Sequence, residues 1–303
     1  MCIKNRSELL FCYDVTNANP NGDPLDENKP RIDEESKINI VTDVRLKRTI
    51  RDYLFNYKGY NGSEDKDIFV REISMDSGGI QDGITRAGDF NNKPNFILQK
   101  CIDIRLFGGV IPLNKNSITF TGPVQFKIGH SLHKVEIKHI KGTGAFASKA
   151  GAQQATFREE YILPYSFICF HGIINEVAAK DTKLNENDIK ELLDAMWNGT
   201  KNLISRSKFG QMPRFLLKVT YKETENGFFI GDLDKKVKLT NFENEFKIRK
   251  VEDFTFDATE LFDSFAKNKE KIEKIEYIAD DNLRIKGLEK TNDIGLTIEN
   301  LHL

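Results

Sequence analysis

The stretch ELLFCYDVTNANPNGDP, residues 8–24, decides how the chain begins to fold. Six of its first eight residues are apolar or aromatic, which predicts a buried strand over 8–15. The Asn, Pro and Gly residues that follow predict a loop, and the same composition continues to residue 37. The chain therefore opens on a strand that enters the core, followed by a long polar loop.

The spacing of apolar residues predicts two amphipathic helices further along the chain. Thr42 is expected to cap the first helix, which runs to about Phe55 with its apolar residues on one face. Asn185 is expected to cap the second, with Leu184 and Ile189 as a hydrophobic staple. Further strands are predicted at 117–128, 161–174 and 213–221. The order β-α-β-β-α-β predicts an α+β fold, specifically the ferredoxin-like arrangement of an RRM domain.

The remaining segments are predicted to be additions to this domain of residues 1–222. Residues 56–109 are irregular and Gly-rich, which predicts an insertion with one short helix at its end. Residues 129–158 combine small residues with Lys and His, which is typical of a projecting loop or hairpin. Residues 223–303 are predicted to pack on the domain as an extension, with helices at 260–266 and 269–278.

Composition narrows the class of protein. The chain has 303 residues, of which 30% are charged, and a formal net charge of −1, so charge alone indicates no particular partner. Its four cysteines are widely spaced and form no CxxC pair, which favours reduced thiols. Because no long apolar run and no apolar leader are present, we expect a soluble cytoplasmic protein without a membrane segment.

The first helix has a basic side. Arg45, Lys47, Arg48 and Arg51 fill an arc opposite the apolar face, where they could follow a phosphodiester backbone without disturbing the core. A solvated helix face is the commoner explanation of such an arc. Two further basic regions favour nucleic acid, because residues 200–222 contain no acid and residues 127–158 contain few.

The loop SRSKFGQ, residues 205–211, joins the second helix to the last strand. Its backbone amides could meet phosphate, and Phe209 could stack on a base. An ordinary turn between helix and strand explains it equally well.

Metal and catalytic sites find little support. The Asn17–Gly22 loop resembles the start of an EF-hand, but Asn28 stands where the bidentate Glu belongs. His130, His133 and His139 lie in one segment without a visible fourth ligand, so we expect them to face solvent or RNA rather than zinc. No hydrolase or P-loop motif is present. We therefore expect no cofactor, no metal and no catalytic residue.

Several motifs in order resemble one family. They are DVTNANPNGDP (14–24), KPRID (29–33), NIVTDVRLKRTIRDYL (39–54), DIRLFGG (103–109), TGPVQFKIGHSLH (121–133), FREEYILPYSF (157–167), ISRSKFGQ (204–211) and IGDLD (230–234). Together they resemble the backbone subunit of type I CRISPR Cascade complexes, the Cas-seven family of the RAMP superfamily. The type I-B branch is the most similar and type I-C the second.

The resemblance implies a hand-like subunit with an RRM-like palm, fingers at 56–109 and a thumb at 129–158. Copies of it would form a helical filament along the guide RNA, with other Cascade subunits beside them, and present the guide to target DNA. Related type III subunits cut RNA with a thumb Asp, and residues 129–158 contain none, so the resemblance implies a non-catalytic subunit. A metal-dependent RNA endonuclease of the same superfamily, and a scaffold without nucleic acid, remain as alternatives.

The same resemblance implies the positions of the RNA contacts. They are Asn19, Asn21, Arg31, Thr42, Arg45, Lys47, Arg48, Arg51, Arg105, Phe146, Arg206, Lys208, Phe209 and Gln211.

Overall fold

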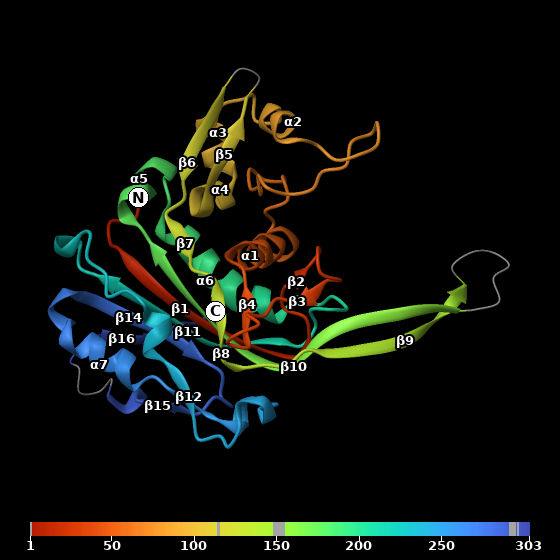
Figure 1. The fold of residues 1–303 in the computed structure, drawn as a ribbon. Helices are drawn as coiled ribbons and strands as arrows, with labels where there is room; N and C mark the ends of the chain where they lie inside the picture. Colours follow the sequence, from red (N-terminus) through yellow and green to blue (C-terminus); the bar gives the residue numbers. More distant parts are fainter. Residues whose placement is uncertain (1, 114–115, 148–154, 291–294, 296) are drawn as a thin grey trace.

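A nine-stranded sheet runs through the centre of the molecule (Figure 1). The computed structural model describes residues 2–113, 116–147, 155–290, 295 and 297–303, with backbone only for 143–147, 155–158, 290 and 297. The strands of this sheet are β1 (Ser7–Ala18), β4 (Ile38–Val41), β7 (Val124–Phe126), β8 (Gly129–Lys134), β9 (Lys138–Ala147), β10 (Ala155–Ile174), β11 (Gln211–Tyr221), β14 (Ile272–Ala279) and β16 (Thr297–Asn300).

The predicted strand β1 lies in the middle of this sheet. It pairs antiparallel with β10 on one side and β11 on the other, so its backbone groups are satisfied along both edges. The sheet order is β16-β14-β11-β1-β10-β8-β4, with β7 and β9 also pairing with β10. Alternate side chains of β1 enter different cores: Leu9 and Phe11 belong to one, Leu10 and Cys12 to the other. Both faces of the sheet are therefore covered.

Helices cover the first face. α1 (Asp43–Tyr57) begins at its predicted cap Thr42, and α6 (Glu186–Lys201) begins at Asn185 with a complete capping box. The expected staple residues Leu184 and Ile189 are both buried in the same core. The short helix α5 (Glu176–Thr182) precedes α6. The two long helices thus form as their sequence patterns predict.

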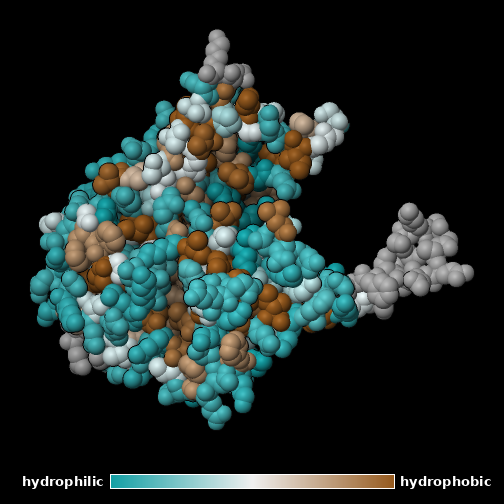
Figure 2. Space-filling model, viewed as in Figure 1, coloured by the Kyte–Doolittle hydropathy of each residue, from teal (hydrophilic) through white to brown (hydrophobic). Residues whose placement is uncertain are grey.

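An insertion lobe, residues 58–121, stands above this helical layer (Figure 1). It contains α2 (Gly83–Gly88), α3 (Pro94–Lys100), α4 (Ile102–Phe107) and a hairpin of β5 (Gly108–Pro112) and β6 (Ser117–Thr121). A small core of its own includes Phe69, Phe90 and Ile97. Figure 2 shows several apolar side chains on this lobe, at the top of the view.

The single strand expected over 117–128 is wrong. β6 pairs with β5 in the insertion lobe, whereas β7 pairs with β10 in the central sheet. The break falls at Gly122 and Pro123, where a Cβ on Gly122 would lie 2.0 Å from the carbonyl carbon of Phe107. Only Gly allows the chain to pass so closely and change direction between the two sheets.

The C-terminal part, residues 223–303, covers the second face of the sheet. Its aromatic residues Phe254, Phe256, Phe262 and Phe265 are fully buried against strands β10 and β11. It also contains α7 (Thr259–Lys267) and a small sheet of β12 (Lys238–Thr240), β13 (Thr255–Asp257) and β15 (Ile285–Lys286). The face on which an isolated RRM sheet would stack bases is therefore not available in this chain.

The predicted helix over 260–266 is confirmed by α7, but the one over 269–278 is wrong, because these residues form most of β14. The Ile residues of this segment stand three apart, a spacing that a helix would also place on one face. In the structure Tyr221 pairs with Ile272 and Thr220 with Lys274, so one residue bulges out of the ladder. The bulge brings Ile272 and Ile275 to the same face of a strand.

A projecting hairpin, described over residues 138–147 and 155–162, extends far from the body (Figure 1). It is formed by β9 and the first half of β10, whose second half continues into the central sheet. The expected projection over 129–158 is thus too long at its start, since Gly129–Lys134 is the sheet strand β8. A second small hairpin, β2 (Gly22–Asp23) and β3 (Lys29–Pro30), lies beside the root of the projection. No helix within the described residues is long and apolar enough to span a membrane.

Candidate nucleic-acid interface

Three segments that are distant in the sequence meet at the end of β1. They are the loop at 16–31, the start of α1 and the loop at 202–210. The backbone N–H of Thr16 donates to the carbonyl of Gly210 at 2.9 Å, and that of Asn19 to Ser207 at 2.9 Å. Gly210 has a φ of +109°, and a Cβ there would lie 2.5 Å from the Thr16 carbonyl oxygen. The close contact between the two loops thus requires a Gly at this position.

Asn21 and Thr42 hold the start of α1. The Asn21 Oδ1 accepts hydrogen bonds from the Thr42 backbone N–H at 2.9 Å and its hydroxyl at 3.0 Å. The Thr42 Oγ1 in turn accepts from the N–H of Arg45 at 3.3 Å. These hydrogen bonds fix the first turn of the helix relative to the Asn-rich loop. The side chains of Asn21 and Thr42, both predicted to contact RNA, are therefore used in contacts within the protein.

Two cations, Arg45 and Lys208, lie at this junction, near enough for the charge of Arg45 to act on Lys208. The Lys208 Nζ donates to the carbonyl of Asn19 at 2.6 Å. Burial, together with the nearby charge of Arg45, lowers the pKa of Lys208 to about 8. No carboxylate lies within ion-pair distance of Lys208 among the residues that the structure describes. Lys208 is thus held in a partly buried site without a carboxylate of its own, whereas Arg45 has Asp52 at 3.9 Å.

Unused polar atoms surround these cations. The Nε of Arg45 and the Oδ1 of Asn19 are both buried without a hydrogen-bond partner, while the remaining Arg45 contacts are Thr49 at 3.0 Å and Asp52 at 3.9 Å. Burial also lowers the pKa of Arg45. Because buried polar groups are normally paired, these two atoms remain available to a ligand or to water.

Exposed residues form the rim. The side chains of Arg48, Arg206 and Phe209 are 53%, 60% and 67% exposed. Arg48 pairs with Asp52 at 2.7 Å, and Arg206 lies 3.4 Å from Glu160, both weak surface pairs that a phosphate could replace. The Gln211 amide donates to the Lys208 carbonyl at 3.1 Å and so holds the loop.

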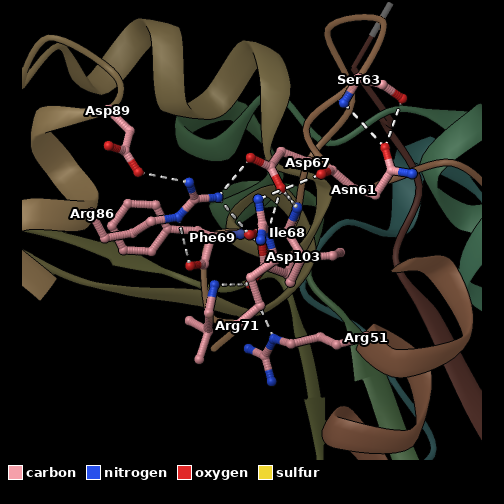
Figure 3. A network of polar contacts seen from close by, with 11 residues as sticks. Arg51, Asn61, Ser63, Asp67, Ile68, Phe69, Arg71, Arg86, Asp89 and Asp103 are labelled. Atoms are coloured by element: carbon pink, nitrogen blue, oxygen red, sulfur yellow. Dashed lines mark hydrogen bonds and ion pairs between the residues drawn. The ribbon is translucent and has the colours of Figure 1, made fainter. Parts of the chain in front are cut away.

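The basic arc of α1 is not uniformly free, which corrects the expectation from the sequence. Lys47 donates to Asp43 at 3.1 Å and to Gln125 at 3.0 Å. Arg51 pairs at 3.0 Å with Asp103 of the insertion lobe (Figure 3). Both side chains are largely buried because the insertion lobe packs on this side of the helix, which helical periodicity alone cannot reveal.

Arg105 is likewise used inside the molecule. Its guanidinium makes two hydrogen bonds to Asp188, at 2.7 and 2.9 Å, and two more to backbone carbonyls of α3. Arg31 pairs with Asp23 at 2.8 Å but keeps a buried Nε without a partner. The side chain of Phe146 lies outside the described residues. Of these three predicted contacts, only Arg31 lies in the loop that forms the junction.

The three histidines do not form a group. His133 is buried, and its Nε2 accepts from the Phe167 N–H at 3.2 Å while Nδ1 lies 2.9 Å from the Lys134 carbonyl. Burial lowers the pKa of His133. His133 therefore faces neither solvent nor RNA, which corrects the expectation from the sequence. His139 stacks on Tyr161 in the projecting hairpin. The described part of the chain contains no cluster of His, Cys, Asp and Glu suited to a metal ion.

Sequence reasoning missed the residues that join the small hairpin to the projecting hairpin. The Tyr161 hydroxyl donates to Glu27 at 2.6 Å, and the Lys29 Nζ lies 5.3 Å from the centre of the Tyr161 ring. At Tyr161 the sequence predicts a strand and nothing more. No local pattern marks this contact, because its two sides are 134 residues apart.

Comparison with known proteins agrees with the pattern of motifs. A family model described as CRISPR-associated protein Cas7 matches residues 5–259. The CRISPR-associated protein Cas7 of Haloferax volcanii is 29% identical over 312 residues, which cover 94% of this chain and 90% of that protein.

Two solved structures share the fold. A chain of a CRISPR RNA-guided surveillance complex in a pre-nicking state has a TM-score of 0.58 at 10% identity, over 98% of this chain and 96% of the other. A chain of a second CRISPR RNA-guided surveillance complex has a TM-score of 0.50 at 12% identity, over 98% and 95%. At these identities the likeness concerns the fold alone.

Proposed function

This chain belongs to the CRISPR-associated protein Cas7 family, and from that premise we propose that it is a guide-RNA-binding backbone subunit of a type I Cascade surveillance complex. Copies of the chain line up along one guide RNA beside other Cascade subunits. The guide, held open by the protein, then pairs with target DNA. Because guide and invading DNA meet in the cytoplasm, we expect the assembly to be located there.

The observation that carries this proposal is the pair of partly buried cations at the junction. Burial chiefly, and the nearby charge of Arg45 in addition, lower the pKa of Lys208, so its positive charge is costly in the free protein. An RNA phosphate between Lys208 and Arg45 would offset this cost and occupy the unpartnered Arg45 Nε. The exposed Phe209 stands on the same loop, where it can stack on a base.

The arrangement of strands supports an RRM-like palm. Strands β11, β1, β10 and β8 are antiparallel neighbours, and α1 and α6 connect the chain in the β-α-β-β-α-β order. The C-terminal part covers the sheet face, however, so we assign the RNA to the loops at the end of β1 rather than to the sheet. The insertion lobe corresponds to the fingers and the projecting hairpin to the thumb, with 223–303 as the extension.

We further propose that the subunit is non-catalytic and belongs to type I-B, with type I-C as the second choice. The branch assignment rests on the motif resemblance. For catalysis, hydrolysis of a phosphodiester needs an acid–base pair or a bound metal. The nuclease alternative relied on the three histidines, of which His133 is committed to backbone hydrogen bonds.

The test is binding and cleavage of labelled single-stranded RNA by the purified protein. We expect binding with little sequence preference and a strong dependence on salt, and no cleavage with Mg²⁺, Mn²⁺ or Zn²⁺. The control is a His130→Ala, His139→Ala double variant, which leaves the buried His133 intact. Failure to bind RNA would reject the proposed function, and cleavage that disappears in the double variant would identify a nuclease.

A further inference from the structure

The long strand β10 makes the projecting hairpin an extension of the sheet itself. Residues 163–174 of this strand pair with β1, whereas residues 155–162 pair with β9 alone. A two-stranded ribbon of this length bends and twists easily, because no third strand or second layer supports it. Its direction relative to the body must therefore be set where it leaves the sheet.

One contact stands at that point. The Tyr161 hydroxyl donates to the Glu27 Oε2 at 2.6 Å, a short, charge-assisted hydrogen bond. The imidazole of His139 stacks on the Tyr161 ring with the ring centres 4.5 Å apart, and the Lys29 Nζ lies 5.3 Å from that centre. Tyr161 therefore contacts the opposite strand of the projecting hairpin and two residues of the β2–β3 hairpin at once.

The β2–β3 hairpin is in turn bound to the cationic junction. The Asn19 side chain donates to the Asn28 carbonyl at 2.7 Å, in the turn that carries Glu27. The Asn19 carbonyl accepts from the Lys208 Nζ at 2.6 Å. Glu27 and Asn28 both have a positive φ, of 48° and 57°, so this turn has a defined shape rather than an extended one. A continuous chain of contacts thus runs from Lys208 to Tyr161.

We propose that Tyr161 is a positioning residue that sets the direction of the projecting hairpin relative to the RNA-binding junction. The inference rests on the proposed function, in which copies line up along one guide RNA, and it assumes that the projecting hairpin of one copy reaches its neighbour. Misdirecting the hairpin harms assembly on a long RNA, because neighbouring copies no longer fit. It leaves the RNA contact of a single copy intact, because Arg45 and Lys208 are untouched.

Three variants test this assignment. Tyr161→Phe keeps the ring, its stacking and its contact with Lys29, and removes only the hydroxyl. Glu27→Ala removes the acceptor. Glu27→Gln keeps an acceptor oxygen and serves as the matched conservative control. Of the two positions changed, Glu27 is exposed and Tyr161 half-buried, so thermal melting should be little changed and differences in RNA binding will not reflect unfolding.

Two measurements separate the effects. One compares binding to an oligonucleotide that a single copy fills with cooperative binding to a long RNA. The other measures the distribution of distances between spin labels at Leu25→Cys and Lys141→Cys. Leu25 is 96% exposed and the Lys141 side chain 69% exposed, and a Cys2→Ser background leaves only the three buried cysteines.

We expect Tyr161→Phe and Glu27→Ala to broaden the distance distribution and to weaken cooperative binding to long RNA about threefold to tenfold. Their affinity for the short oligonucleotide should stay within about twofold of wild type, and Glu27→Gln, which keeps a neutral acceptor oxygen, should lose less cooperativity than Glu27→Ala. Unchanged distances and cooperativity, or an equal loss on short and long RNA, would overturn the assignment. A wild-type protein that binds no RNA would reject the proposed function instead, while the label distances would still test the contact.

Discussion

The Nε of Arg51 lies 3.0 Å from the Oδ2 of Asp103, whose side chain is completely buried. Asp103 also accepts hydrogen bonds from the backbone N–H group of Phe69 at 2.8 Å (Figure 3) and from that of Val70 at 3.0 Å. This carboxylate therefore joins helix α1 to two segments of the insertion lobe. Arg51, one of the four cations of the basic arc, therefore has a structural role.

We predict that Arg51→Ala lowers the free energy of unfolding by about 3 kcal/mol, because it leaves a buried carboxylate without its counter-charge. Urea denaturation followed by circular dichroism measures the change. Arg48→Ala is the matched control, since the exposed pair of Arg48 with Asp52 contributes about 0.5 kcal/mol or less. Equal losses of unfolding free energy in the two variants would show that the Arg51–Asp103 pair stabilises the fold no more than an exposed pair does.

A second prediction concerns the cations that remain available. The double variant Arg45→Ala, Arg48→Ala should stay folded and bind single-stranded RNA more weakly, with a salt slope smaller by about 1.4 if each residue neutralises one phosphate. The measurement is a binding isotherm at several salt concentrations. A Lys238→Ala, Lys250→Ala variant removes the same charge from exposed positions of the C-terminal part. Equal slopes for both double variants would remove the junction from the RNA interface.

The sequence predicts the elements that carry strong local signals. β1, α1 with its Thr42 cap, α6 with its Asn185 capping box and α7 form as expected, because caps and apolar periodicity act within a few residues. The sequence does not predict β14, because a bulge shifts its alternating pattern. It does not predict the break between β6 and β7 either, because the two halves of one apolar segment join different sheets.

The sequence predicts only part of the candidate site, because local patterns do not reveal contacts between distant segments. The basic residues of α1 were identified, but their division into available and buried cations depends on the insertion lobe, which folds against them from 52 residues away in the case of Asp103. The low exposure of Lys208 and its approach to Arg45 depend on a loop contact across the molecule. Such long-range pairing leaves no periodic trace in the sequence.

A third prediction tests the role of the C-terminal part as a cover for the sheet. Phe256 is fully buried, with its ring centre 5.3 Å from that of Phe215 and 5.8 Å from that of Phe167. Phe256→Ala should cost about 3–5 kcal/mol of unfolding free energy, because it leaves a cavity between the sheet and its cover. Phe246 is 41% exposed, so Phe246→Ala should change stability by about 0.5 kcal/mol at most. Similar values for the two would mean that this cover contributes little to the fold.

The last prediction follows from the pKa of Lys208. Burial and Arg45 lower this pKa from 10.5 to about 8, so the folded protein carries a cost of charging Lys208 that is fully present below pH 8. As the pH rises from 8 towards the unfolded value, the folded amine loses its proton first and this cost disappears. The free energy of unfolding should therefore receive a favourable contribution from Lys208 as the pH rises through that interval. RNA binding should behave in the opposite way, because the neutral amine no longer attracts phosphate.

We accordingly expect the affinity for poly(A), whose bases do not titrate in this range, to fall between pH 7 and pH 9, with uptake of a proton on binding at the upper end. Isothermal calorimetry in buffers of different ionisation enthalpy measures that proton. Lys208→Arg keeps its charge throughout, so its affinity should be nearly independent of pH. The nearby Tyr13 does not interfere, because burial raises its pKa far above the range. A pH dependence that persists unchanged in Lys208→Arg would show that another group controls binding.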